Sequence, residues 1–135
     1  MSAASDFLEL KVLDHVLRYS TAPYTGPSTL YLGLFTASTG LETNSPSAEV
    51  STGGGTNYAR QTVTFAAAST GSSSTNATVT FPAAGANWGT ITHVAVMDAS
   101  TSGNVLFYGA VTTSKTIETG DTFQVSSGNL TVSLA

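Results

Sequence analysis

The chain carries few side chains that could form a catalytic centre. Its histidines are His15 and His93, and Asp98 follows His93 by five positions in a strand-like segment. An odd offset along a strand places two side chains on opposite faces, so this pair cannot form a His–Asp dyad within the strand. The serines at 72–74 lack the Gly-x-Ser-x-Gly frame of a nucleophile elbow. We therefore expect no catalytic residues and no enzyme activity.

A glycosidase is the enzyme class kept as an alternative, because it needs only two carboxyl groups about 5–10 Å apart in a cleft. The chain has eight acidic residues. Three of them (Asp6, Glu9 and Asp14) lie on a single predicted helix. The sequence thus favours a protein that binds or builds over one that catalyses.

Metal and cofactor sites are equally poorly supported. Cysteine is absent, and the two histidines are too far apart in sequence for the short spacings of zinc sites. Asp98, Glu118 and Asp121 could meet at one end of a sandwich as oxygen ligands for Ca²⁺, although carboxylates at turns more often shape the turn. Glycines 53–55 lack the Lys–Ser/Thr that follows a phosphate loop, and we interpret them as a flexible loop tip. We expect no metal and no cofactor.

Trp88 is the single tryptophan and stands in a loop-like stretch between Pro82 and Gly89. A tryptophan beside a loop can be a platform for a sugar ring or an anchor in an interface. It can also plug one end of a β-sandwich, which is the interpretation we favour. The tyrosines are scattered and form no visible binding stripe.

The composition limits the classes of partner that the chain is expected to bind. Only 9% of the 135 residues are charged and the net charge is −4, while Ser and Thr make up roughly 30% of the chain. The four basic residues form no stripe, so we expect no nucleic-acid partner. These residues are Lys11, Arg18, Arg60 and Lys115. No apolar run approaches 18 residues, so we expect no membrane contact. The first residues do not resemble a signal peptide, which predicts synthesis in a host cytoplasm without signal-dependent export.

Residues 5–19 are the one segment with helical periodicity. Asp6 and Glu9 have the spacing of a capping box, with Asp in place of the usual Ser or Thr. Apolar residues recur at helical spacing and predict an amphipathic helix, with polar residues opposite: Phe7, Leu10, Leu13 and Leu17 against Lys11, Asp14, His15 and Arg18. The helix should end before Pro23.

After residue 28 the periodicity changes from 3.6 to 2. Residues 29–36 are apolar on both faces, which predicts a strand buried on both faces, with the helix as the candidate cover for the side away from the core. Residues 37–57 read as a long loop with a possible short strand at 48–50. Segments 57–67 and 76–81 should pair as a hairpin. Further strands are predicted at 89–98, 103–111, 115–117, 122–125 and 129–134.

Eight or nine short strands in one chain of this size predict a single all-β domain, an antiparallel β-sandwich of jelly-roll topology with one N-terminal α-helix. In this organisation residues 1–20 form the helix, which packs on the sandwich or on a partner. Residues 21–135 form the sandwich.

The order of five segments resembles a family of small virion proteins of tailed bacteriophages, which are often labelled tail fibre proteins and look similar to jelly-roll capsid decoration (cement) proteins. These segments cover nearly the whole chain: 6–18, 27–37, 57–65, 81–99 and 103–123. The resemblance implies a structural role in the virion and brings no catalytic residues with it.

Two functions follow from this resemblance. The first is a capsid decoration protein that bridges copies of the major capsid protein or other virion proteins, as a homo-oligomer such as a dimer or trimer. The second is a tail or tail-fibre component that contacts host surface glycan through Trp88. We expect partner contacts from the helix, the 37–57 loop and the region of Trp88, with these residues as candidates: Phe7, Leu10, Leu17, Arg18, Tyr58, Arg60 and Trp88.

Overall fold

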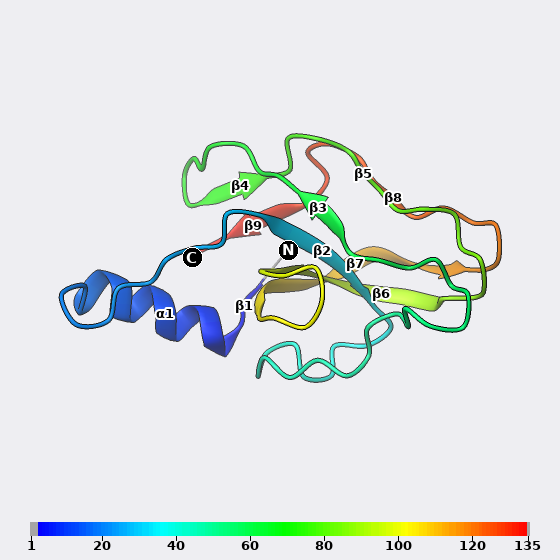
Figure 1. The fold of residues 1–135 in the computed structure, drawn as a ribbon. Coiled ribbons are helices and arrows are strands. Elements are labelled where there is room, and N and C mark those ends of the chain that lie inside the picture. The colour runs from blue at the N-terminus through cyan, green and yellow to red at the C-terminus, as the bar shows by residue number, and fades with distance from the viewer. Residues whose placement is uncertain (1–2, 135) are drawn as a thin grey trace.

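The structure is a computed structural model that describes residues 3–134. This part of the chain holds one helix, α1 (Asp6–Leu17), and nine strands (Figure 1). In chain order the strands are β1 (Ala3–Ala4), β2 (Leu30–Phe35), β3 (Gln61–Val63), β4 (Ser72–Ser74), β5 (Val79–Thr80), β6 (Gly89–Met97), β7 (Val105–Ile117), β8 (Gln124–Val125) and β9 (Thr131–Ser133). No helix in the described range is long and apolar enough to cross a bilayer.

The main sheet has five antiparallel strands in the order β1-β7-β6-β2-β3. Two short ribbons, β4 with β9 and β5 with β8, lie over one of its faces and form the second layer. The predicted all-β sandwich with one N-terminal helix is therefore confirmed. The second layer is split into two ribbons, and the jelly-roll topology stays a prediction.

Two strand predictions need correction. Segments 103–111 and 115–117 are parts of one strand, β7, because the Thr-rich residues between them stay extended. They are extra residues of β7 at the register shift opposite Ile91 and His93 of β6. The predicted hairpin of 57–67 with 76–81 does not form as such, since β3 pairs with β2 and β5 pairs with β8. The chain still pairs locally between the two segments, around a bridge of Phe65 with Thr75 and a hydrogen bond from the Asn76 amide to Thr64 O at 3.1 Å.

The larger core lies between the main sheet and the two ribbons. Alternate residues of β2 and β6 point into it, where they meet side chains from the ribbons and from the loop that holds Trp88. Its buried members include Leu32, Leu34, Phe81, Trp88 and Ile91. Period-2 alternation in the sequence marks these inward positions, because successive side chains of a strand face opposite sides.

The second face of the main sheet holds a smaller core. Phe35, Ala95, Met97 and Val105 pack there around Leu41, which is fully buried. The strand 29–36 is thus buried on both faces as predicted, but its outer cover is the 37–49 loop and not the helix. Gly40 allows this loop to turn back, because it has φ +76° and a Cβ there would lie 1.9 Å from the carbonyl oxygen of Ser45.

The 37–57 loop also completes the edge of the sheet. Its residues 48–50 run beside the end of β2, where the Thr36 amide donates to Ala48 O at 2.9 Å and the Val50 amide donates to Leu34 O at 3.0 Å. The possible short strand at 48–50 is therefore present as a bridge. The glycines at 53–55 are exposed as expected of a loop tip, and Gly55 lies close to Gly85, where a Cβ would be 2.2 Å from Gly55 O.

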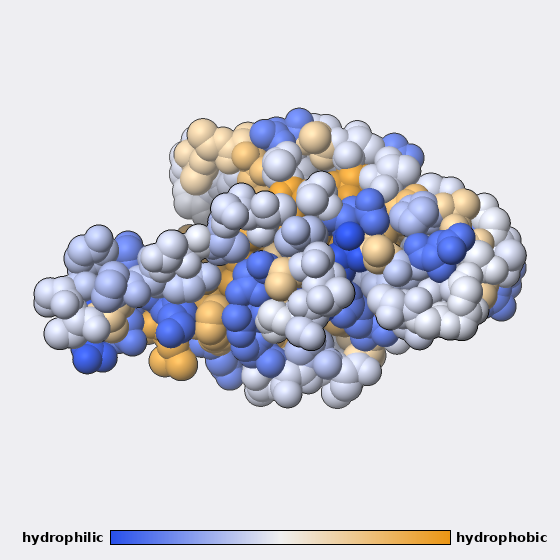
Figure 2. Space-filling view, in the orientation of Figure 1, coloured by the Kyte–Doolittle hydropathy of each residue, from blue (hydrophilic) through white to orange (hydrophobic). Residues whose placement is uncertain are grey.

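Helix α1 projects from one end of the sandwich, close to the last described residues of the C-terminal strand (Figure 1). Apolar surface gathers along it and where it meets the body of the molecule (Figure 2). The helix was predicted at 5–19 and is observed at Asp6–Leu17.

Candidate interaction surface

Ser5, and not Asp6, caps α1. The Leu8 amide donates to Ser5 Oγ at 3.3 Å, and Ser5 is fully buried. Ser5 also joins the helix to β7, because its amide donates to Leu106 O at 2.9 Å and its hydroxyl donates to Val105 O. The predicted capping box starting at Asp6 is wrong by one residue: Ser5 has the extended backbone that a cap requires, with ψ 160°.

We expect Ser5→Ala to lower the free energy of unfolding by about 1–2 kcal/mol, because it removes the cap and leaves the Leu8 amide without its partner. Urea unfolding followed by circular dichroism measures this change. Asp6→Ala is the matched control at the neighbouring position, and its loss should stay below about 1 kcal/mol, the size of a helix-dipole effect. A larger loss for Asp6→Ala than for Ser5→Ala would contradict the assignment of the cap.

The inner side of α1 is fixed to its own chain. Leu8 is the buried residue of the helix. Phe7 is half-buried and packs edge-on against Tyr24, with ring centroids 6.3 Å apart. The Tyr24 amide donates to His15 Nδ1 at 3.0 Å, which gives this histidine a structural role. The helix is therefore held in place by contacts on one side only.

The outer side of α1 is a line of exposed leucines. Leu10, Leu13 and Leu17 are 65%, 56% and 74% exposed, and their i, i+3, i+7 spacing puts them on one face. Val16 beside them is also exposed. We call Leu10, Leu13 and Leu17 the leucine face. It contains two of the predicted contact residues, Leu10 and Leu17, whereas the predicted contact Arg18 is paired with Asp14 at 3.3 Å.

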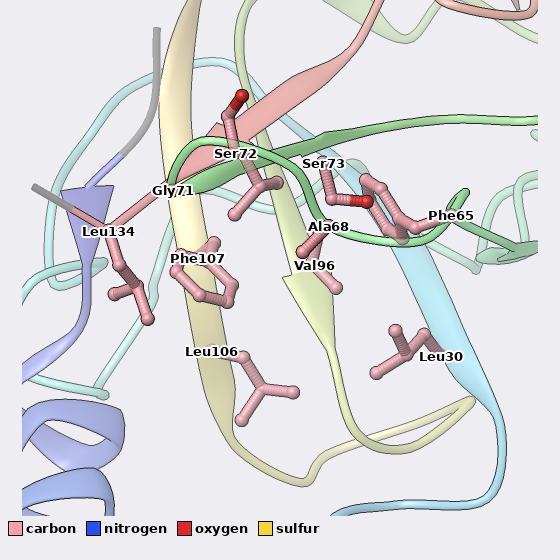
Figure 3. A pocket seen from close by; sticks show the side chains of 11 residues that line it. Leu30, Phe65, Ala68, Gly71, Ser72, Ser73, Val96, Leu106, Phe107 and Leu134 are labelled. Carbon is pink, nitrogen blue, oxygen red and sulfur yellow. The ribbon is translucent and has the colours of Figure 1, made fainter.

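An apolar groove of about 300 Å³ lies near the helix, on the sheet face that the ribbons leave partly open (Figure 3). Leu106 and Phe107 of β7, with Val96 and Leu30, line the sheet side of it. Ala68 and the start of β4 form its upper wall, and Leu134 stands at the end nearest α1 (Figure 3). Leu134 is 56% exposed and also borders a hollow lined by Leu8, Val12 and Leu13 of the helix.

A β-bulge forms the floor of the groove. Val105 pairs with Met97 and Phe107 pairs with Val96, so Leu106 is an extra residue in β7. A bulge re-aims side chains, and here the adjacent residues Leu106 and Phe107 both line the groove. Sequence alternation alone would have placed them on opposite faces. The groove was consequently missed, since no sequence signal marks a bulge between two apolar residues.

Three predicted contact residues lie inside the molecule. Tyr58 and Trp88 are 4% and 5% exposed and pack together with their rings edge to face at 5.4 Å. Trp88 Nε1 donates to Thr56 O at 2.8 Å. Trp88 is the plug of the sandwich end, and the alternative in which it is an exposed platform for sugar is wrong. Tyr58 likewise offers no free face to a partner.

Arg60 is the third, and it belongs to a polar network under the loops. Its guanidinium makes a bidentate pair with Glu49, at 2.7 Å and 2.8 Å, and donates to the carbonyls of Ala99 and Ser102. Tyr58 donates to Glu49 at 2.8 Å and accepts from the Leu34 amide at 3.0 Å. Burial and the Glu49 carboxylate raise the pKa of Tyr58 well above its usual range, so the hydroxyl stays protonated. The network therefore joins three segments to β2: the loop that holds Glu49, the segment of Tyr58 and Arg60, and the turn between β6 and β7.

The carboxylates predicted as a possible Ca²⁺ site do not meet. Asp98 follows β6 and accepts from the Asn104 amide and side chain, whereas Asp121 caps the Glu118 amide beyond the far end of β7. The antiparallel pairing of β6 and β7 puts these groups at opposite ends of the hairpin. His93 contacts the Thr92 hydroxyl at 2.8 Å, so the structure gives it a local partner rather than Asp98.

A different acidic group does form, at the start of α1. Carboxylate oxygens of Asp6, Glu9 and Glu42 lie within 4.8 Å of one another, and all three residues are exposed. Desolvation, a hydrogen bond with Asp6 and repulsion from Asp6 and Glu9 raise the pKa of Glu42. Exposed acids commonly gather without an ion, and no further feature of the cluster points to a ligand.

The raised pKa of Glu42 has a testable sign. The folded chain binds this proton more readily than the unfolded chain, so the favourable effect is present at low pH and is lost as pH rises through the folded-state pKa. We expect Glu42→Gln to raise the unfolding temperature at pH 7, with the gain shrinking as the pH falls and Glu42 becomes protonated. Glu118→Gln makes the same change in net charge away from the cluster and should give no such gain. An equal response of both variants would show that the cluster has no effect of its own.

Comparison with protein families shows which family the chain belongs to. The family described as podophage GP4 fiber I protein gp80 matches residues 3–133, which is nearly the whole chain. The chain belongs to this family. A search of curated proteins finds no match.

Membership in this family makes the chain a phage virion structural protein. The part of the earlier resemblance that named small tailed-phage virion proteins is confirmed. Within this frame the features without a partner in the described chain are the leucine face and the groove. Both are surfaces suited to binding another protein.

Proposed function

We propose that the chain is a structural, non-catalytic subunit of a fibre on a phage particle and that α1 attaches it to its neighbours. The observation that carries this proposal is the leucine face, three more-than-half-exposed leucines on a helix whose other side is fixed to the sandwich. A helix presenting apolar anchors at i, i+3 and i+7 is a recurring way of binding a groove on another protein. The partners are then other virion proteins and copies of the same chain.

The family description favours a fibre over capsid decoration, which reverses the order of our two expectations. Host glycan contact through Trp88 is not part of the proposal, because that side chain is buried. The charge-poor surface suits either location, since neighbouring copies with few charges do not repel one another strongly.

Labelled electron microscopy of whole particles tests the proposal. A short epitope tag inserted at the exposed Gly53–Gly54 turn, decorated with an antibody fragment, should mark a projecting fibre. A tag at Thr119, at the opposite end of the sandwich from α1, should mark the same structure. Labels distributed evenly over the head would instead support the decoration role and overturn the fibre assignment.

A further inference from the structure

The leucine face and the groove belong to the same chain but are not packed against each other. Leu8 and the Ser5 bonds to Val105 and Leu106 hold the inner side of α1 against the body, so Leu10 and Leu17 lie on the side that faces away from it. The groove is open and lined almost wholly by carbon atoms. Each surface therefore needs a partner from outside the chain, and each has the chemistry that the other requires.

We propose that copies of the chain assemble by laying the leucine face of one copy into the groove of the next. This inference rests on the proposed fibre role and names the surfaces that join its subunits. Helix-in-groove docking uses an apolar stripe with i, i+3, i+7 anchors and an apolar channel, which are the two features seen here.

Charge on the two surfaces is compatible with this contact. The groove is lined by apolar side chains together with Gly71, Ser72 and Ser73, and none of its lining residues is charged. Glu9 and Asp14 flank the leucine face, and Asp6 lies in line with it at the exposed N-terminal end of α1, so these charges would stay at the rim of the contact, in water. Docking then buries no unpaired charge. A buried charge without a partner would disfavour association.

The extent of the two surfaces also fits a second copy. The leucine face with Val16 and Leu134 forms an exposed apolar area of a few hundred Å², comparable to the largest patch of a typical monomer. A standard interface buries about 800 Å² on each partner, so polar residues around these surfaces must complete the contact. Because Leu134 adjoins both the helix and the groove, each copy presents one continuous surface that both gives a helix and receives one.

The oligomeric mass in solution is the first test. Wild-type protein at about 100 µM should run as an oligomer in sedimentation, and the triple variant Leu10→Gln, Leu13→Gln, Leu17→Gln should be a monomer with an unchanged circular dichroism spectrum, since glutamine keeps helix propensity. Ala68→Glu places a charge at the exposed wall of the groove and should also give a monomer. The polar-face variant Lys11→Gln, Asp14→Asn, Arg18→Gln is the control and should remain an oligomer.

Cross-linking tests the geometry directly, because cysteine is absent from the chain. Ser20→Cys, just beyond the helix, and Ala68→Cys, at the groove, are made in separate proteins, mixed and treated with a short bis-maleimide reagent. We expect a linked heterodimer at least tenfold above the level obtained when Ser20→Cys is mixed with Thr119→Cys. Equal yields for the two pairs would overturn the docking proposal.

A monomeric wild type, or an oligomer that survives both the leucine and the Ala68→Glu variants, would also overturn it. Either result leaves the fibre role intact if the labels still mark a fibre. A label on the head together with cross-linked oligomers would do the reverse, so the two proposals fail separately.

Discussion

Trp88→Ala is expected to lower the free energy of unfolding by about 3–5 kcal/mol, the usual loss when a buried tryptophan is cut to alanine. The indole packs against Tyr58 and Phe81, with ring centroids 5.4 Å and 6.3 Å apart, and its Nε1 satisfies Thr56 O. Removing it leaves a cavity at the end of the larger core and takes from Thr56 O one of its two hydrogen bonds, the other coming from the Gly85 amide. The loss comes from packing and one hydrogen bond and involves no binding function.

Urea unfolding followed by far-ultraviolet circular dichroism measures this loss, because the variant has no tryptophan fluorescence. Tyr19→Ala is the matched control, since Tyr19 is an exposed aromatic residue and its removal should change stability by less than about 0.5 kcal/mol. Trp88→Phe should fall between the two. A Trp88→Ala protein as stable as Tyr19→Ala would contradict the burial on which this account depends.

Arg60→Ala is expected to cost about 3 kcal/mol, because it leaves the Glu49 carboxylate without its bidentate partner in a site that is only partly exposed. The Arg60 side chain is 5% exposed, so water cannot replace it without rearrangement. The same change removes the hydrogen bonds that Arg60 donates to the carbonyl oxygens of Ala99 and Ser102, in the turn that joins β6 to β7. Three loops lose a common anchor at once.

Arg18→Ala is the control for Arg60→Ala. The Arg18–Asp14 pair is exposed, and such pairs contribute about 0.3–0.5 kcal/mol within a helix. The double variant Glu49→Ala, Arg60→Ala should be less unstable than the sum of the two single variants, because it removes both charges. Additive losses in this cycle would show that the two side chains do not act as a pair.

Local patterns in the sequence predicted the elements well. The i, i+3, i+7 leucines located α1, and the alternation of Leu30, Leu32 and Leu34 identified the strand that became β2. Trp88 as a core plug followed from its place in a loop at a strand end. These inferences succeed because they depend on side-chain periodicity, which secondary structure imposes over a few residues.

Long-range contacts could not be obtained this way. Leu41 covers the second face of the sheet from a loop that has no periodicity. We had expected the helix to cover this face. Arg60 looked like a surface charge, but its partners are 11, 39 and 42 residues away. The groove depends on an extra residue, Leu106, that only the pairing of β6 with β7 reveals. Each of these features arises from pairing between distant segments.

The candidate contact residues divide in the same way. Leu10 and Leu17, chosen for their place on the helix, are exposed, and Leu13 joins them. Tyr58, Arg60 and Trp88 were chosen for their residue type and their place in or beside loops, and the structure uses all three inside the molecule. Aromatic and arginine side chains are common in interfaces and in cores, so type without burial does not separate the two.

The central claim is that this fibre-family protein works through the outer face of α1. Incorporation of the variant Leu10→Gln, Leu13→Gln, Leu17→Gln into phage particles tests it most directly, with the polar-face variant of the same helix as the reference. Quantitative mass spectrometry of purified particles should find the polar-face variant at wild-type copy number and the folded leucine variant at one-tenth or less. Wild-type occupancy of the leucine variant would contradict the account.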